Sequence, residues 1–316
     1  MSTCTTASQD LNEPLAGTAA TASTWLLIEQ PGPWGVKALT CSHLDPELGR
    51  ALEAAAEGTG VRVALIRRPG RHADFHATTR RHVYVAHTIP GNTWLRGTTT
   101  ESPQDLLALD FAALGAGDHR GFGTPHEGAP LALVCTNGKR DRCCALLGRP
   151  LAADLAASGQ DGIWEVTHLG GHRFSPTLLV LPYGYAYGRA DAAHVKDTLE
   201  AVRAGRIVTD GCRGNSAWER PGQAAELAVR TSAGIDDAGV LTVVGAEATA
   251  PGHGALWEAT VTHMDGRRWH VTVAQSASLP ARPESCGAAL GTPARMDVLA
   301  VDEIAPAVTG PLGASG

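Results

Sequence analysis

The stretch that decides this chain's fold and chemistry begins as Cys135-Thr-Asn-Gly-Lys-Arg-Asp-Arg-Cys143-Cys144 and ends as Trp164-Glu-Val-Thr-His168-Leu-Gly-Gly-His172. The apolar run 131–134 before it predicts a buried strand, which would place Cys135 at the strand's C-terminal edge, where α/β proteins bind ligands. Thiolates and imidazoles brought together bind zinc or an iron–sulfur cluster. The pattern therefore predicts a metal centre, for which the rest of the chain is the scaffold.

Turn and loop signals lie between the candidate donors. Asn137-Gly138 is a turn pair, so the chain can fold back and bring a second cysteine towards the first. The two histidines are four residues apart, but Gly170-Gly171 between them weakens a helix and favours a tight loop. Such a loop lets backbone N–H groups approach closely, as the sulfides of a cluster require.

These residues carry a resemblance to a known family. The pair Cys135 and Cys144, the Gly-Lys-Arg-Asp segment between them, and His168-Leu-Gly-Gly-His172-Arg-Phe resemble the sucrase/ferredoxin-like family of thioredoxin-like [2Fe-2S] ferredoxins. The resemblance is dense from about 131 to 188 and looser elsewhere. It implies one [2Fe-2S] cluster ligated by Cys135, Cys144, His168 and His172. Cys144 fits the family spacing better than Cys143.

The implied function is electron transfer. The chain would exchange single electrons with redox partner proteins, a reductase and an acceptor, which the sequence does not identify. Neutral imidazoles in place of thiolates raise the reduction potential, and an imidazole N–H facing solvent would make that potential depend on pH. Two alternatives remain for the basic residues near the site (Lys139, Arg140, Arg142 and Arg173): a collar for an acidic reductase, or a solvated loop with a local Arg140–Asp141 pair. We find no pair of carboxylates in the sequence that indicates glycoside hydrolysis, so we expect a redox carrier rather than a stand-alone enzyme.

Two other functions are compatible with the same residues. The ligand set and the His-x3-His spacing also suit Zn²⁺, which would make the chain a zinc-stapled binding module. A thiol–disulfide redox protein could act through Cys143-Cys144 or Cys135, although no C-x-x-C begins a helix. Colour and metal content separate these alternatives, since only an iron–sulfur protein is red-brown.

Length and composition describe a globular protein of more than one domain. The 316 residues are 43% hydrophobic and 18% charged, and the net charge of −6 argues against nucleic-acid binding. No apolar run is long enough to predict a membrane span, and the polar start 1–22 lacks the features of a signal peptide. We therefore expect a cytoplasmic protein. In a reducing compartment the scattered Cys4, Cys41, Cys212 and Cys286 are interpreted as free thiols or buried small side chains.

The order of predicted elements indicates an α/β fold with a repeat. The order strand–helix–strand, strand–strand–helix occurs twice and is the thioredoxin-like order. We predict a disordered lead-in (1–22), a thioredoxin-like domain without a cluster (23–128), a thioredoxin-like ferredoxin domain (129–205), a small α+β domain (206–305) and a tail (306–316). The α+β domain rests on a helix over 223–230 and four alternating runs, 241–244, 257–262, 269–273 and 296–301.

Overall fold

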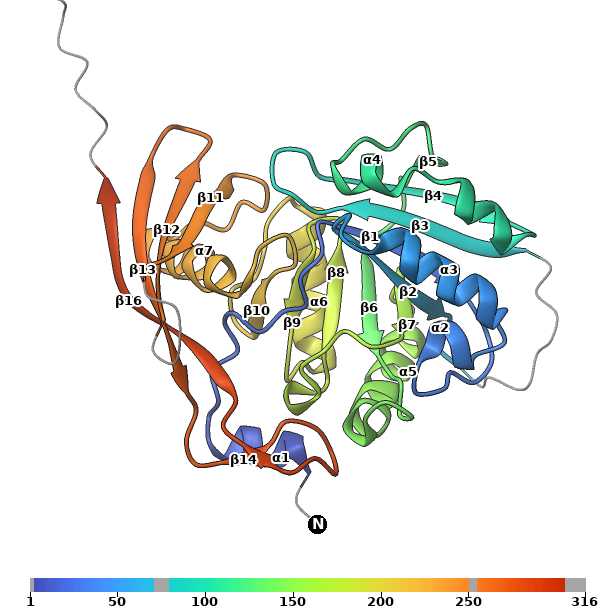
Figure 1. The fold of residues 1–316 in the computed structure, drawn as a ribbon, viewed down its shortest axis with the longest axis horizontal. Helices are drawn as coiled ribbons and strands as arrows, with labels where there is room; N and C mark the ends of the chain where they lie inside the picture. The colour runs from blue at the N-terminus through green and yellow to red at the C-terminus, as the bar shows by residue number, and fades with distance from the viewer. Residues whose placement is uncertain (1–2, 71–79, 250–254, 305–316) are drawn as a thin grey trace, which may run out of the picture.

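The computed structural model describes residues 3–70, 80–249 and 255–304, and its centre is one large mixed sheet with helices (Figure 1). Ten strands form this sheet, in the order β10-β9-β8-β6-β7-β2-β1-β3-β4-β5. The α/β class predicted from the sequence is confirmed. Within the described ranges, no helix has the length and apolar character needed to cross a bilayer.

The first half of the large sheet contains four main strands. Its elements are β1 (Thr24–Glu29), α2 (Ala38–Cys41), α3 (Pro46–Ala56), β2 (Val61–Arg67), β3 (Arg81–His87), β4 (Trp94–Thr100) and α4 (Phe111–Gly115), with the short β5 (Thr124–Pro125) at the edge. α3 begins at Pro46 because the Asp45 carboxylate accepts a hydrogen bond from the Glu47 amide at 2.8 Å and proline fits the first turn of a helix.

The second half repeats this order along the chain. Its elements are β6 (Leu131–Cys135), α5 (Arg149–Ala157), β7 (Ile163–Val166), β8 (Leu178–Leu181), β9 (Tyr185–Tyr187) and α6 (Ala192–Arg203), followed by β10 (Cys212–Asn215) at the sheet's other edge. One π-helical turn, Cys144–Gly148, leads into α5. The strand predicted over 131–134 is present as β6.

The two halves have the same strand order and the same strand directions. In the first half the order is β2-β1-β3-β4, and in the second it is β7-β6-β8-β9. The first two strands in each order are parallel, and the other neighbouring pairs are antiparallel. An antiparallel contact between β2 and β7 joins them, with Ile66 opposite Val166. Glu29 of β1 is paired with Ile66, and Cys135 of β6 is paired with Val166. Glu29 and Cys135 therefore occupy equivalent positions in the two halves. The first half thus has a carboxylate where the second has a thiol.

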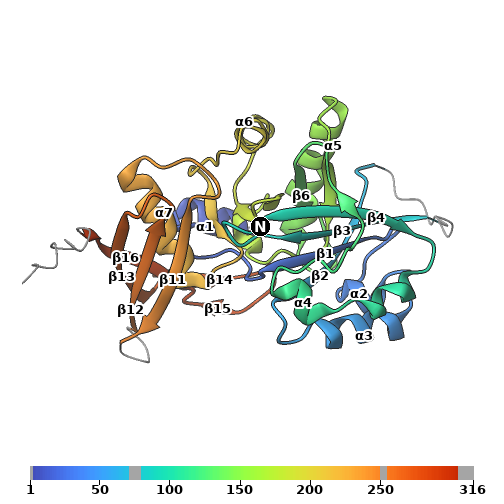
Figure 2. The same cartoon turned by 90° about the horizontal axis from the view of Figure 1, so that it is seen from above.

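The helices of the two halves cover opposite faces of the sheet. Figure 2 shows α5 and α6 on one face and α2, α3 and α4 on the other. Alternating strand residues divide between separate cores: Leu26 and Ile28 pack in the α3 core, whereas Ala132 and Val134 pack in the core with α5 and α6. A third core, which includes Trp25, contains buried residues from both halves.

A smaller unit follows the large sheet along the chain. It consists of α7 (Arg220–Ala233) packed on an antiparallel sheet of β11 (Leu241–Ala248), β12 (Leu256–His263), β13 (Arg268–Ala277) and β16 (Ala294–Ile304). The two short strands β14 (Arg282–Pro283) and β15 (Leu290–Gly291) form a separate hairpin between β13 and β16. Buried Glu226 and Arg230 of α7 bond to each other at 2.6 Å, and Arg230 donates to the Tyr185 hydroxyl of β9 at 2.8 Å. This network fastens the smaller unit to the large sheet.

The N-terminal segment differs from the predicted disordered lead-in. Residues 4–10 form helix α1 (Cys4–Asp10), which lies beside β14 in Figure 1. Its small polar residues suggested disorder, but Cys4, Thr5 and Ser8 are buried against other parts of the chain. Tertiary contacts therefore override the composition here. The predicted tail, 306–316, lies outside the described residues.

Candidate metal centre

The predicted site lies where two parallel strands of the second half end. Cys135 is the last residue of β6, and His168 follows β7 by two residues, so both leave the same edge of the sheet. Cys144 starts the π-helical turn before α5, and His172 starts a short 3₁₀ turn. The end of a strand, the start of a π-helical turn and one loop thus supply the four side chains.

The structure brings these four predicted side chains together. The Cys135 thiol donates to the Thr167 carbonyl at 3.1 Å, and Cys144 and His168 are its neighbours. Sγ of Cys144 lies 3.5 Å from Nδ1 of His172, and the two imidazole rings stack with centroids 4.2 Å apart. Cys135, Cys144 and His172 are buried, whereas His168 is half-buried. The result is a compact group of two sulfur and two nitrogen donors with one ring near solvent.

The two histidines lie on a loop, as predicted, and two arginines hold this loop. Gly170 and Gly171 have φ of 78° and 69°, a region that favours glycine. Fully buried Arg213 donates to the Gly170 carbonyl at 3.1 Å, and Arg62 donates to the His168 carbonyl at 3.0 Å. The backbone of the loop is therefore fixed from both sides, which presets where the rings point.

The protonation states of Cys135 and His172 suit metal ligation, whereas Cys144 has to lose its proton to bind a metal. The hydrogen bond from Cys144 holds the pKa of Cys135 well below its ordinary value despite burial, and the same contact together with burial raises the pKa of Cys144. Burial, helped by the neighbouring His168, lowers the pKa of His172 to about 4. A neutral imidazole and a readily formed thiolate are the forms that bind metals.

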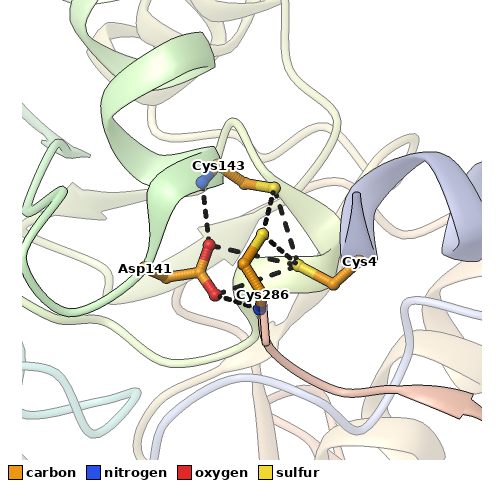
Figure 3. A group of neighbouring side chains, drawn as sticks. All are labelled: Cys4, Asp141, Cys143 and Cys286. Carbon is orange, nitrogen blue, oxygen red and sulfur yellow. Dashed lines mark hydrogen bonds between the residues drawn. The ribbon is translucent and has the colours of Figure 1, made fainter. Parts of the chain in front are cut away.

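A second thiol cluster lies next to the first, and the sequence did not predict it. Figure 3 shows Cys4, Cys143 and Cys286 around the carboxylate of Asp141. The three sulfurs are 3.2–3.6 Å apart, and no disulfide joins them. Cys4 comes from α1, Cys143 from the helical residues just before the π-helical turn, and Cys286 from the hairpin between β14 and β15. Asp141 also lies within ligand reach of Cys144 and His172, so it sits between the two groups.

The predicted basic collar is only partly exposed. Lys139, Arg140 and Arg142 are exposed, but Arg173 is buried and pairs with Glu13 at 2.7 Å. Asp141 is also buried, and its carboxylate accepts the amide hydrogens of Cys143 and Cys286 at 2.8 Å each. Arg173 therefore does not belong to an exposed collar, because it pairs with buried Glu13. Asp141 does not belong to a solvated loop, because it is buried and bonds to backbone amides.

Several residues of this region carry no local sequence signal. Cys4 and Cys286 were interpreted as isolated thiols because each stands alone in its segment, and only the tertiary fold brings them to Cys143. Arg62 and Arg213 lie 106 and 43 residues from the carbonyls that they bind. The sequence contains an odd number of cysteines, seven, and this count is a signal that a thiol outside the predicted pair has a role.

The comparisons with known proteins identify the family. A model of the sucrase/ferredoxin-like family matches residues 15–214, well over half of the chain. This range includes all four predicted ligands and both halves of the large sheet, while Cys4 and Cys286 fall outside it. No curated protein and no solved structure matches the chain. The chain therefore belongs to the sucrase/ferredoxin-like family.

Proposed function

We propose that this protein transfers electrons and holds one [2Fe-2S] cluster with Cys135, Cys144, His168 and His172. The observation that carries the proposal is the convergence of two thiols and two imidazoles from three segments of the chain at one buried edge of the sheet. Family membership supports it. The repeated strand order supports the further proposal that both halves are thioredoxin-like, with the cluster in the second half alone.

The donor chemistry fits this cluster. Sulfur and imidazole donors bind iron, and ligand softness favours iron–sulfur centres over hard cations such as Mg²⁺. The two thiols touch each other and the two rings stack, so each like pair can serve one iron. When bound, such a cluster accepts and releases a single electron. Two neutral imidazoles reduce its total negative charge, which raises the potential relative to four thiolates.

The two histidines differ in their exposure to solvent, so we assign them different roles. His172 is buried, and the Thr5 hydroxyl of α1 donates to its carbonyl at 3.1 Å. His168 instead lines a groove of about 290 Å³ together with Lys37, Arg62 and Arg140. The His168 ring is thus the part of the site closest to solvent and the route by which electrons and a proton would enter.

A docking surface for the reductase surrounds this route. Lys139, Arg140 and Arg142 are exposed beside the site, and Leu146 and Leu147, just after Cys144, are 51% and 39% exposed. Cations next to exposed apolar side chains suit a partner with an acidic rim. We propose an acidic redox protein as that partner.

Structural zinc is the second candidate. Asp141, Cys144 and His172 lie within ligand reach of one another, and this mixed set suits Zn²⁺. Iron and zinc analysis of the purified full chain tests both candidates. The cluster requires about two irons per chain and visible absorption that dithionite bleaches. A colourless protein with zinc lost on mutation of Cys144 would replace the redox proposal with the zinc module.

A further inference from the structure

The thiols of Cys4, Cys143 and Cys286 form a nearly equilateral triangle. Their sulfurs are separated by 3.6 Å (Cys4 to Cys143), 3.6 Å (Cys4 to Cys286) and 3.2 Å (Cys143 to Cys286). Three segments from the beginning, middle and end of the chain supply them, as Figure 3 shows. Cys4 and Cys143 are buried, and Cys286 is half-buried. A free cysteine is often buried as a small apolar side chain, but three sulfurs that meet beside one buried carboxylate also form a set of possible metal donors.

The separations match a single tetrahedral ion. A zinc–sulfur bond of about 2.3 Å and a tetrahedral angle place neighbouring sulfurs about 3.8 Å apart, slightly farther than observed. A disulfide needs sulfurs at about 2.05 Å and would leave the third thiol without a role. A cluster of several irons would need more widely spaced thiolates, since each would bind a different iron.

Asp141 completes the set of donors. Its carboxylate oxygens lie 3.9 and 4.0 Å from Sγ of Cys4. Each oxygen accepts one backbone N–H, from Cys143 or Cys286, at 2.8 Å, and keeps a further lone pair. The same two hydrogen bonds orient the carboxylate and hold two of the cysteines in place, which is the support that metal ligands receive from their surroundings.

We propose that Cys4, Cys143, Cys286 and Asp141 bind one Zn²⁺ ion at a site distinct from Cys135, Cys144, His168 and His172. On binding, each of the three thiols releases its proton to solvent and forms a zinc–sulfur bond, and a carboxylate oxygen of Asp141 supplies the fourth bond. The role is structural, because four protein donors leave no open position. The inference does not depend on the electron-transfer proposal.

The ion would join helix α1 and the hairpin after β14 to the helical turn before α5, beside the redox site. α1 carries Cys4 and also contacts the backbone of His172 through Thr5, while the hairpin after β14 carries Cys286. The buried carboxylate of Glu13 bridges the same elements by pairing with Arg173 and Arg282. Zinc would therefore hold α1 and the hairpin after β14 in place beside His172, which stays buried.

The full chain is expressed in a medium that contains iron and zinc. Analysis of the metals in the purified protein tests this proposal. We expect about one zinc per chain in the natural protein, and a loss of that zinc in Cys286→Ser and Cys4→Ser without loss of iron. Cys144→Ser should lose iron and keep zinc. Cys41→Ser is the matched control, because this exposed thiol belongs to neither group; both metals should remain.

A second measurement avoids the risk that a variant misfolds. The natural protein is alkylated with and without a zinc chelator, and the labelled cysteines are identified by mass spectrometry. Cys4, Cys143 and Cys286 should be protected until the zinc is removed, while Cys41 should react in both samples. Labelling that the chelator does not change, zinc that depends on Cys144 instead of Cys286, or a Cys143–Cys286 disulfide in the purified protein would overturn the proposal. A protein with zinc at this site but without iron would contradict only the electron-transfer proposal.

Discussion

Cys143 and Cys144 are neighbours in the chain, yet their thiols belong to different groups. Sγ of Cys143 lies 3.2 Å from Sγ of Cys286, whereas Sγ of Cys144 lies 3.5 Å from Nδ1 of His172. Adjacent residues on a helical turn point about 100° apart, so the start of the turn before α5 separates the two side chains. The geometry favours Cys144 as the cluster ligand and argues against a thiol–disulfide couple between these two cysteines.

The first prediction compares serine substitutions of this pair. Cys144→Ser removes a proposed cluster ligand, so the purified protein should lose most of its iron and its visible absorption. Cys143→Ser leaves the four cluster ligands intact and should retain both. Iron assay and absorption spectra measure the outcome; equal iron in the two variants would remove Cys144 from the ligand set.

The second prediction uses the two glycines of the histidine loop. An alanine at either position adopts a left-handed φ, which costs about 1 kcal/mol. A Cβ at position 170 meets nothing within 4 Å, but at position 171 it would lie 2.2 Å from Nη2 of Arg213. Arg213 is fully buried and hydrogen-bonded to Thr18 and Gly170, so it cannot move freely.

Gly171→Ala should therefore lower the free energy of unfolding by about 2–4 kcal/mol, and Gly170→Ala, the matched control, by about 1 kcal/mol. Urea denaturation of the two variants measures the difference. Equal losses would mean that the Arg213 contact does not constrain the loop.

The third prediction concerns the dependence of stability on pH. Although burial acts to raise it, hydrogen bonds from Arg282 and Arg173 lower the pKa of Glu13 below its ordinary value of 4.5. A carboxylate with a lowered pKa in the folded state stabilises the fold above the unfolded value and loses that contribution as the pH falls through the folded value. The unfolding free energy of the natural protein should thus decrease on acidification below about pH 4.5.

Glu13→Gln should remove this acid-sensitive contribution and cost roughly 3 kcal/mol at pH 7, because two buried arginines lose their carboxylate. Glu284→Gln is the control: it pairs with Arg173 at 3.2 Å, but its side chain is 56% exposed, so its loss should cost less than about 1 kcal/mol. Denaturant unfolding from pH 3 to 7 measures both. An unchanged acid limb in Glu13→Gln would show that this carboxylate does not control acid stability.

The fourth prediction tests the docking surface. Charge reversal of Arg140 and Arg142 to Glu should slow reduction by an acidic reductase several-fold at low salt, and the effect should shrink at high salt because ions screen exposed charges. Arg268→Glu, an exposed change on β13 of the smaller unit, is the control. Stopped-flow reduction at two salt concentrations gives the rates. Rates that fall equally in all three variants would point to a general charge effect and not to a docking site.

Local patterns predicted part of the large sheet correctly. The apolar run 131–134 predicted strand β6, since a strand buried on both faces has a continuous apolar sequence. The paired glycines correctly predicted a loop between His168 and His172, and the convergence of these histidines with Cys135 and Cys144 is present in the structure.

The residues that sequence reasoning missed depend on long-range contacts. Cys4 is 139 residues from Cys143, and Cys286 is 143 residues beyond it, so no spacing rule relates them. Burial of α1 likewise follows from its contacts with the 3₁₀ turn at His172 and with β14, and not from its own weakly apolar sequence. Arg173 was expected on the surface because arginine usually is, but a buried Glu13 compensates its charge.

The most direct test of the electron-transfer proposal is pulsed electron paramagnetic resonance of the dithionite-reduced protein, with its histidines labelled with ¹⁵N. If His168 and His172 are ligands, the spectrum of the reduced cluster should contain strong couplings to two histidine nitrogens, and one should disappear in His168→Cys. A reduced iron–sulfur signal without strong nitrogen coupling, or a purified protein with no iron, would contradict the proposed cluster.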